Sequence, residues 1–116
     1  MPTVSPVKTN PSAAVADIIT WSGIITGDTV NRWEIHNATA VAGSVQITGT
    51  FNGGTTAVLQ VSNDGTTWFT ADDVQGDAVS ATAAAFFELS LTARYVRMSV
   101  ASGSSDSITA VLVLRG

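Results

Sequence analysis

The chain has 116 residues, of which nine are acidic and five basic, so its formal net charge is −4, and it contains no cysteine. This length suits one domain with a single core, and the lack of cysteine excludes disulfide bridges and thiolate metal sites. Only 12% of the residues are charged, about half the ~25% usual for soluble domains. We therefore expect a weakly charged surface, suited to lasting contact with other protein.

The charge pattern and the hydropathy pattern exclude two classes of partner. The basic residues form no run, which argues against a nucleic-acid-binding surface. No stretch approaches the ~20 apolar residues that a membrane span needs, and the first residues lack the pattern of a secretory signal. We expect a soluble protein without nucleic-acid or membrane partners, and with no cofactor.

Residues 1–16 are predicted to form an extended N-terminal arm, followed by a domain over residues 17–116. All three prolines, Pro2, Pro6 and Pro11, lie in this segment, which is polar and has no hydrophobic period. Near polyproline geometry the arm would reach roughly 50 Å, at ~3.1 Å per residue. A disordered tail is the alternative interpretation.

From residue 17 onward, short runs of Thr, Val, Ile and aromatic residues alternate with clusters of Gly, Asn, Asp and Ser, which is typical of strands and turns. Strands are predicted over residues 18–25, 32–36, 44–51, 56–62, 78–81, 85–91, 94–100 and 108–114. Eight or nine short strands predict an all-β protein, an antiparallel β-sandwich of jelly-roll or Ig-like type.

The segment from Ser44 to Phe69 shows the pattern most clearly. Residues 44–51 alternate apolar and polar side chains, as expected of a strand with one buried face. Asn52-Gly53 fits a type I′ turn, so residues 56–62 are expected to return as the antiparallel partner of a hairpin. At Asn63-Asp64-Gly65 a second tight turn is predicted, with side-chain oxygens capping backbone amides and Gly65 in the left-handed conformation.

The last strand is apolar on both faces, with Val111 and Val113 on the face opposite Leu112 and Leu114. This pattern suits a central strand, or one whose outer face a neighbouring subunit covers. Val111 and Val113 are therefore candidate partner-binding residues.

Catalytic motifs are missing, and the chain is not expected to be an enzyme. His36 is the only histidine, and no serine lies in a nucleophile elbow. Asp72, Asp73 and Asp77 form the only acidic cluster, a weak candidate for calcium because their spacing does not match an EF-hand loop. Asn37-Ala38-Thr39 matches a glycosylation sequon, without other signs of secretion.

Four large aromatic residues are candidates for a binding surface. They are Trp21, Trp33, Trp68 and Tyr95, and at least two of the four are expected in the core. Trp33, Trp68 and Tyr95 offer faces on which a sugar could stack. Arg94 and Arg97 are predicted to pair across the sheet with Asp64, Asp72 or Glu88.

Two families share motifs with this chain. The pieces VLQVSNDGTTWF (residues 58–69) and ARYVRMSV (residues 93–100) are similar to motifs of discoidin-like carbohydrate-binding modules. From about Trp21 onward, the order of motifs resembles that of small β-sandwich proteins of tailed-phage virions. The motifs are a Trp-containing strand, a GDT turn, SVQITGTF, SNDGTTWF, an acidic DVQGDAV loop, RYVR and an aliphatic last strand. Many proteins of that kind are capsid decoration or cement proteins.

The virion resemblance implies a structural protein on the outer capsid surface, made in the host cytoplasm, whose partners are the major capsid protein and other copies of itself. A small homo-oligomer, taken as a trimer, is expected by the same resemblance. The arm, with Pro2, Val4, Pro6, Val7 and Pro11, would extend over neighbouring subunits. The alternatives are a carbohydrate-binding or adhesion module and a phage tail or fibre component.

Overall fold

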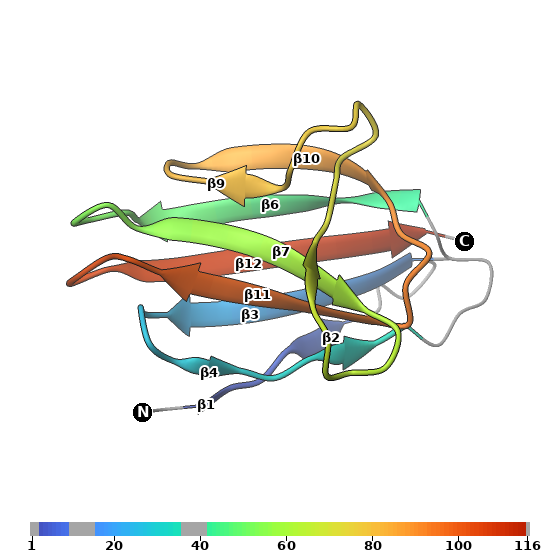
Figure 1. Cartoon of the computed structure of the whole chain (residues 1–116), viewed down its shortest axis with the longest axis horizontal. Coiled ribbons are helices and arrows are strands. Elements are labelled where there is room, and N and C mark those ends of the chain that lie inside the picture. The colour runs from blue at the N-terminus through green and yellow to red at the C-terminus, as the bar shows by residue number, and fades with distance from the viewer. Residues whose placement is uncertain (1–2, 10–15, 36–41, 116) are drawn as a thin grey trace.

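The computed structural model describes residues 3–9, 16–35 and 42–115. Every regular element in this part of the chain is a β-strand, twelve in all. Two main sheets pack face to face, and a separate pair of short strands lies beside them (Figure 1). The predicted all-β antiparallel sandwich is therefore confirmed.

The first sheet, called sheet I here, has the strand order β10-β6-β12-β3-β2. Its strands are β10 (Ala85–Ser90), β6 (Ala42–Thr50), β12 (Ser107–Arg115), β3 (Ala16–Ile24) and β2 (Val7–Thr9). All four pairings in it are antiparallel. The three central strands have nine residues each and give sheet I its breadth.

The second sheet, sheet II, has the order β5-β11-β7, and β7 pairs on its other side with both β8 and β9. Its strands are β5 (Trp33–Glu34), β11 (Tyr95–Ala101), β7 (Thr56–Ser62), β8 (Phe69–Thr70) and β9 (Ser80–Ala81). The remaining strands, β1 (Thr3–Val4) and β4 (Thr29–Val30), pair in parallel with each other.

The strand order is that of a jelly roll. We number the jelly-roll strands from β3, count β5 as the second, leave out the short strands β1, β2 and β4, and take β8 and β9 as one interrupted strand. Sheet I then contains strands 1, 8, 3 and 6 in that order, and sheet II contains strands 2, 7, 4 and 5. This arrangement of two interlocked Greek keys over two sheets distinguishes the jelly roll from the Ig-like sandwich. Of the two topologies left open by the sequence, the jelly roll is the one observed.

The predicted hairpin between residues 44–51 and 56–62 is wrong. β6 pairs with β10 and β12 in sheet I, whereas β7 pairs with β11, β8 and β9 in sheet II. The two positive-φ residues of the connection are Gly53 and Gly54, at 69° and 85°, one position later than the predicted turn. Because β6 and β7 each have one apolar face, crossing between the sheets lets these faces meet across the core, which a hairpin within one sheet would not do.

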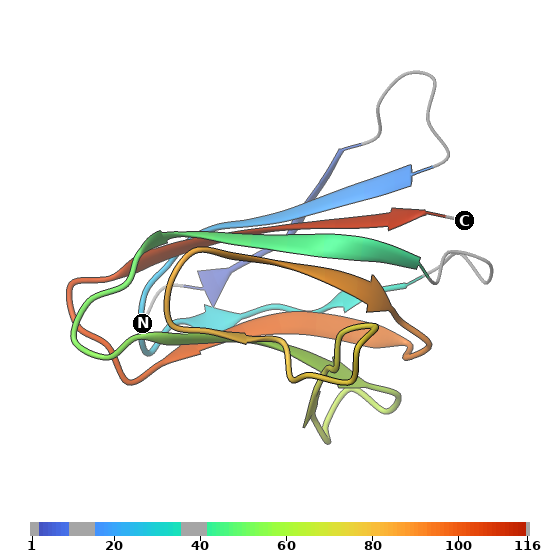
Figure 2. The same cartoon turned by 90° about the horizontal axis from the view of Figure 1, so that it is seen from above.

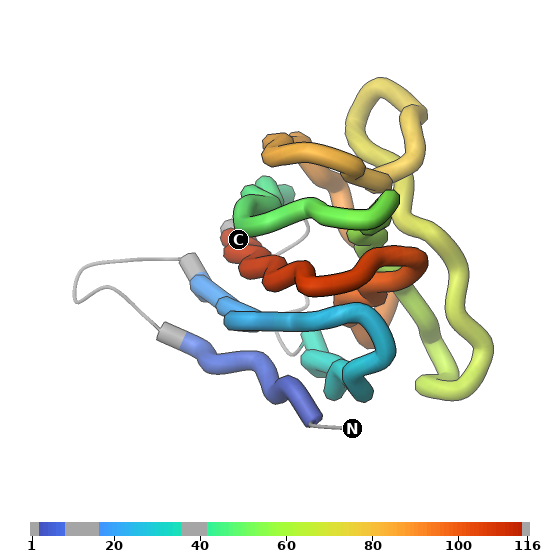
Figure 3. Tube along the Cα trace, turned by 90° about the vertical axis from the view of Figure 1, so that its left-hand side faces the viewer, coloured from blue at the N-terminus to red at the C-terminus, as the bar shows by residue number. Residues whose placement is uncertain are grey.

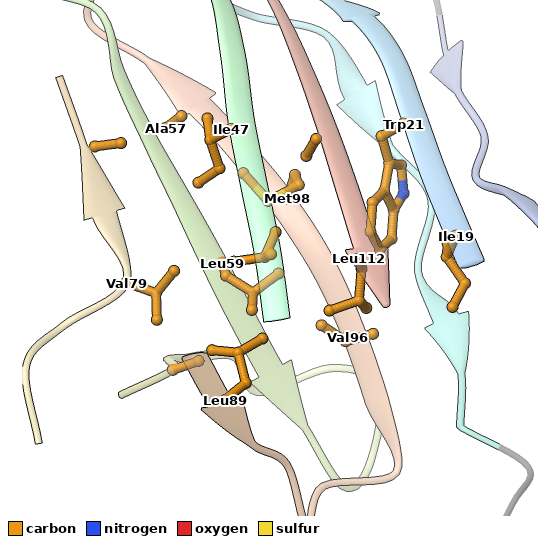
Figure 4. Packing of buried hydrophobic residues seen from close by; sticks show 14 of the residues in the cluster. Ile19, Trp21, Ile47, Ala57, Leu59, Val79, Leu89, Val96, Met98 and Leu112 are labelled. Carbon is orange, nitrogen blue, oxygen red and sulfur yellow. The ribbon is translucent and has the colours of Figure 1, made fainter. Parts of the chain in front are cut away.

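The core lies between the two sheets and takes alternate residues from the long strands (Figure 4). Ile19 and Trp21 of β3 and Val45 and Ile47 of β6 are completely buried, as are Ala57 and Leu59 of β7. The Trp21 indole N–H donates a hydrogen bond of 3.0 Å to the Asn31 carbonyl, so burial leaves no polar atom of this ring unsatisfied.

The described part of the predicted arm, residues 3–9, lies along its own domain (Figure 2). β1 pairs with β4, the Asn31 N–H donates to the Val4 carbonyl at 2.8 Å, and β2 then extends sheet I beside β3. Val4 packs against the core. This differs from the expected reach over neighbouring subunits, because pairing and burial within the domain satisfy the backbone and the apolar side chain of this segment.

A buried carboxylate joins three connections at one end of the sandwich, at the left of Figure 1. Asp106 belongs to the β11–β12 connection and Thr55 to the β6–β7 connection. One carboxylate oxygen of Asp106 lies 2.8 Å from the hydroxyl oxygen of Thr55. The Thr26 backbone N–H, after β3, donates to the other oxygen at 2.9 Å. This network links the β6–β7 and β11–β12 connections, which cross between the two main sheets, with the β3–β4 connection.

Candidate functional site

The outer face of sheet I carries the predicted partner-binding residues Val111 and Val113, and both are half-buried there. β12 is the middle strand of the five, so one of the two predicted explanations for its apolar outer face, a central position, is observed. No described element lies over this face of the sheet (Figure 2).

A row of side chains crosses this face from edge to edge. Val7 is the register partner of Thr20, Thr20 of Val111, Val111 of Gln46, and Gln46 of Phe86. Opposed residues on neighbouring antiparallel strands point to the same side of a sheet, so these five side chains form one row. Val7 and Phe86, at its two ends, are 61% and 62% exposed.

The next row has the same character. Ile18 is the register partner of Val113, Val113 of Ser44, and Ser44 of Glu88. Glu88 is the only charged residue in these two rows as far as they are described, and it lies on the edge strand β10. We call the two rows, Val7, Thr20, Val111, Gln46 and Phe86 with Ile18, Val113, Ser44 and Glu88, the apolar face.

The outer face of sheet II is polar and charged. The Arg97 guanidinium lies 4.1 Å from the centre of the Trp68 ring, and its Nε donates a hydrogen bond of 2.8 Å to Gln60 Oε1. Arg32 lies over the ring of Tyr95 on the same side, at 4.3 Å. The outer face of sheet II therefore carries arginine side chains, whereas the two rows of sheet I contain Glu88 as their one described charge.

The predicted ion pairs of Arg94 and Arg97 are not the ones formed. Arg94 Nε lies 2.7 Å from Glu34 Oε2 on the neighbouring strand β5, which raises the pKa of the Arg94 guanidinium through this hydrogen bond. Arg97 bonds to the neutral Gln60 instead of a carboxylate. The expected partners Asp64, Asp72 and Glu88 lie on other elements, whereas Glu34 and Gln60 are cross-strand neighbours.

The aromatic candidates for sugar stacking do not share one surface. Trp21 is fully buried in the core and Tyr95 is only 8% exposed, so two of the four aromatics are buried, although Tyr95 lies under Arg32 and Arg94 on the outer side of sheet II. Trp33, opposite Val96 in the register, packs against the core cluster, while Trp68 lies under Arg97 on the outer side. Val96 and Arg97 are consecutive residues of β11 and therefore point to opposite faces of the sheet. Trp33, the register partner of Val96, and Trp68, which contacts Arg97, thus lie on different sides of sheet II.

Asp72, Asp73 and Asp77 surround a tight loop between β8 and β9. Asp73 Oδ1 accepts hydrogen bonds from the backbone N–H groups of Gln75 and Asp77, at 2.9 and 3.0 Å. Asp72 forms a bridge to Ala78. Within residues 3–9, 16–35 and 42–115, no group of three His, Asp or Glu side chains is placed to hold a metal ion. Asp73 thus caps the loop in the manner of an Asx turn.

The predicted turn at Asn63-Asp64-Gly65 is confirmed. Gly65 has a φ of 79°, and Asp64 Oδ1 accepts hydrogen bonds from the N–H groups of Thr67 and Thr66, both at 2.8 Å. These bonds, with one from the Ser62 hydroxyl, hold the pKa of the Asp64 carboxyl far below its usual range. The turn therefore carries a carboxylate that is ionised near neutral pH and hydrogen-bonded to the turn's own backbone.

A shallow hollow of about 200 Å³ lies beside this turn. Its lining combines Val61, Asn63, Asp64, Thr67 and Phe69 with Ser62 and Ala93. Phe69 is 65% exposed, although its position in the sequence, next to Trp68, gives no signal of this. A two-residue strand at the sheet edge leaves the ring uncovered, and only the tertiary arrangement reveals it.

Several predicted residues lie outside the described part of the chain: Pro2, Pro11, His36 and the sequon at Asn37. Pro6 is half-buried between β1 and β2. Among the described residues, no helix is long and apolar enough to cross a membrane. Comparisons of the chain with family models, curated proteins and solved structures find no match.

Proposed function

We propose that this chain is a structural virion protein of the capsid decoration or cement type, which binds the outer shell and stabilises contacts between major capsid subunits. The motif order that resembles tailed-phage virion proteins, from the GDT turn to the aliphatic last strand, supports this assignment. It is proposed to act without catalysis and without a cofactor, on the outer surface of the virion after synthesis in the host cytoplasm.

One observation carries the proposal. Five large apolar side chains of the described chain are exposed, and besides Ile25 and Val74 in connections they lie on two surfaces: Val7 and Phe86 on the outer side of sheet I, and Phe69 at the hollow beside β8 of sheet II. Scattered exposed apolar residues need no explanation, but exposed apolar residues that border a defined face or a hollow suggest contact with protein. A cement protein needs two contact surfaces, because each copy must hold its neighbour or a second capsid subunit as well as the shell.

The shell contact is assigned to the hollow with Phe69. An exposed aromatic ring is a typical anchor of a protein interface, and the hydrogen-bonded carboxylate of Asp64 beside it supplies a negative charge. Residues 3–9 are less suited to this role than the sequence suggested, because they are paired with β4 and β3 of their own domain. Repetition over the shell lets a modest contact per copy hold the assembly through multivalency.

Cosedimentation tests the proposal. The full chain is mixed with a panel of empty tailed-phage shells prepared without decoration protein, and the saturation of the pelleted shells is measured. Saturable binding is expected, and Phe69→Lys should weaken it by about tenfold or more. Ile25→Lys, at an exposed apolar residue outside both surfaces, is the control and should leave shell binding unchanged. No saturable binding to any shell would contradict the virion role.

A carbohydrate-binding function is the second candidate, and the same hollow favours it. An apolar ring next to carboxylate, amide and hydroxyl groups, as Phe69, Asp64, Asn63 and Thr67 provide, is the kind of lining that recognises a sugar. Glycan-array binding that Phe69→Ala abolishes, together with no binding to shells, would establish this function in place of the virion role.

A further inference from the structure

We propose that the apolar face of sheet I is the docking surface for a second copy of this chain, so that two sandwiches associate face to face with their β12 strands at the centre. The inference concerns self-association and stands whether or not the chain binds a shell. It commits to a dimer contact, in place of the trimer that the virion resemblance implied.

The size of sheet I is suited to such a contact. Its strands have six, nine, nine, nine and three residues, in the order β10, β6, β12, β3 and β2. With about 4.8 Å between strands and about 3.3 Å between residues, the sheet covers roughly 600 Å². Two outer faces of sheet I in full contact would bury about 1,200 Å² together, which reaches the lower end of the range for specific interfaces, and the two rows of the apolar face form the middle of that contact.

The charges on this face favour an identical partner. Glu88 is the only charged residue described in the two rows, and it lies on the edge strand β10, so two copies can stack without opposing like charges at the centre. Apolar, hydroxyl and amide side chains fill the rest of the two rows. A partner recognised through charge would find only Glu88 at the edge to pair with, whereas a second copy presents the same, almost uncharged rows.

The two edges of sheet I are unsuited to pairing between copies, which favours its face. The Val74 N–H donates a hydrogen bond of 3.0 Å to the Glu88 carbonyl, so the loop after β8 covers part of the outer edge of β10. At the opposite edge of sheet I, β2 has only three residues and follows Pro6. Short, covered or proline-flanked edges are the devices by which β proteins prevent edge-to-edge association.

Val111 lies at the centre of the proposed contact. It is the fifth of the nine residues of β12, and β12 is the third of the five strands of sheet I. A two-fold interface is self-complementary, so the residue at its centre meets its own copy. Val7 and Phe86, at the two ends of the row through Val111, then lie at the rim of the contact.

Analytical ultracentrifugation of the full chain tests the association. The wild type is expected to sediment at twice the chain mass of 11.9 kDa. Phe86→Lys should weaken the dimer by about tenfold, and Val111→Lys, which opposes two like charges at the centre, should leave only monomer. Phe69→Lys is the matched control, the same substitution at an equally exposed phenylalanine of sheet II, and should leave the dimer intact. A wild-type monomer or trimer, or a dimer that Phe69→Lys dissociates and Phe86→Lys does not, would overturn the inference.

A cross-linking experiment covers the case in which Val111→Lys fails to fold. The chain contains no cysteine, so one introduced at position 111 is unique. A short bis-maleimide should join Val111→Cys chains into covalent dimers, because packed sheets lie about 10 Å apart. Phe69→Cys, treated alike, should stay monomeric. Equal yields from the two variants, or no covalent dimer of Val111→Cys, would contradict face-to-face docking.

Discussion

The carboxylate of Asp106 accepts a hydrogen bond of 2.6 Å from the hydroxyl group of Thr26, eighty positions earlier in the chain. Asp106 is only 5% exposed, and its oxygens also accept the backbone N–H of Thr26 and lie within bonding distance of the Thr55 hydroxyl. Buried carboxylates persist where their lone pairs are satisfied. At this end of the sandwich, one side chain therefore links three connections between strands of different sheets.

Replacing Asp106 should destabilise the domain. In Asp106→Asn the side chain keeps its size, but the charged acceptor for Thr26 and Thr55 is lost, and the amide N–H₂ faces two donors. We expect the melting temperature to fall by about 5 °C or more, because buried donors lose their partner. Thermal unfolding followed by circular dichroism measures the change. Asp77→Asn, on an exposed loop, serves as the control and should melt like the wild type.

Acid should weaken the fold through the same residue. Hydrogen bonds from the Thr26 hydroxyl and then the Thr26 N–H hold the pKa of Asp106 below its usual value of 3.8. A carboxyl whose pKa is lower in the folded state binds protons more readily when unfolded, so its contribution is complete above about pH 4 and is lost as the pH falls through the folded pKa. Urea titrations from pH 7 to pH 2 should show this loss.

The pKa of Asp64 is lowered in the same direction, so part of the acid sensitivity belongs to the turn at residues 63–65. Asp106→Asn should therefore reduce the loss of unfolding free energy below pH 4 without removing it. An Asp106→Asn variant with the same pH dependence as the wild type would show that Asp106 does not contribute.

Gly103 should not tolerate any side chain. A Cβ atom there would overlap Thr55 Oγ1 and Asp106 Oδ2, and it would approach the Asn52 carbonyl oxygen to 2.8 Å. Gly103→Ala is expected to cost about 1–3 kcal/mol of unfolding free energy, as overpacking of a closed site usually does. Chemical denaturation measures the cost, and Ser104→Ala, at the exposed neighbouring position, should change it by less than about 0.5 kcal/mol.

Strand β1 offers a test of whether the N-terminal segment belongs to the domain. Val4 packs against the core cluster while its neighbour Thr3 is exposed. Val4→Asp should lower the unfolding free energy by about 2 kcal/mol, because a charge would replace an apolar contact. Thr3→Asp should have little effect. Equal stability of the two variants in urea would indicate that residues 3–9 leave the domain in solution, as the arm interpretation requires.

The alternation of apolar and polar residues predicted most of the strands and their buried faces correctly. Val45, Ile47, Ala57 and Leu59 all point into the core as expected. Alternation does not say which strand is the neighbour, and for this reason the sequence predicts a hairpin of β6 and β7 although the two strands belong to different sheets. The glycine turn between them looks the same in sequence whether the chain folds back in one sheet or crosses to the other.

The candidate site was predictable only in part. β12 is apolar on both faces, and this pattern predicts Val111 and Val113 as candidates, because its inner face is used by the core and its outer face is apolar as well. Val7, Thr20, Gln46 and Phe86 join them through register alone, across segments far apart in the chain. The exposure of Phe69 likewise depends on the short edge strand β8 and on no local pattern.

The position of β12 has a consequence for the order in which the protein can be made. Figure 3 shows this strand, the last of the chain, between β6 and β3, so it fills the middle of sheet I. Until the ribosome has released residues 107–115, β6 and β3 have no common partner, and their facing edges and apolar inner sides stay open. Sheet I therefore cannot close before residues 107–115 have left the ribosome, and because its pairings join distant segments, we expect its closure to take milliseconds to seconds.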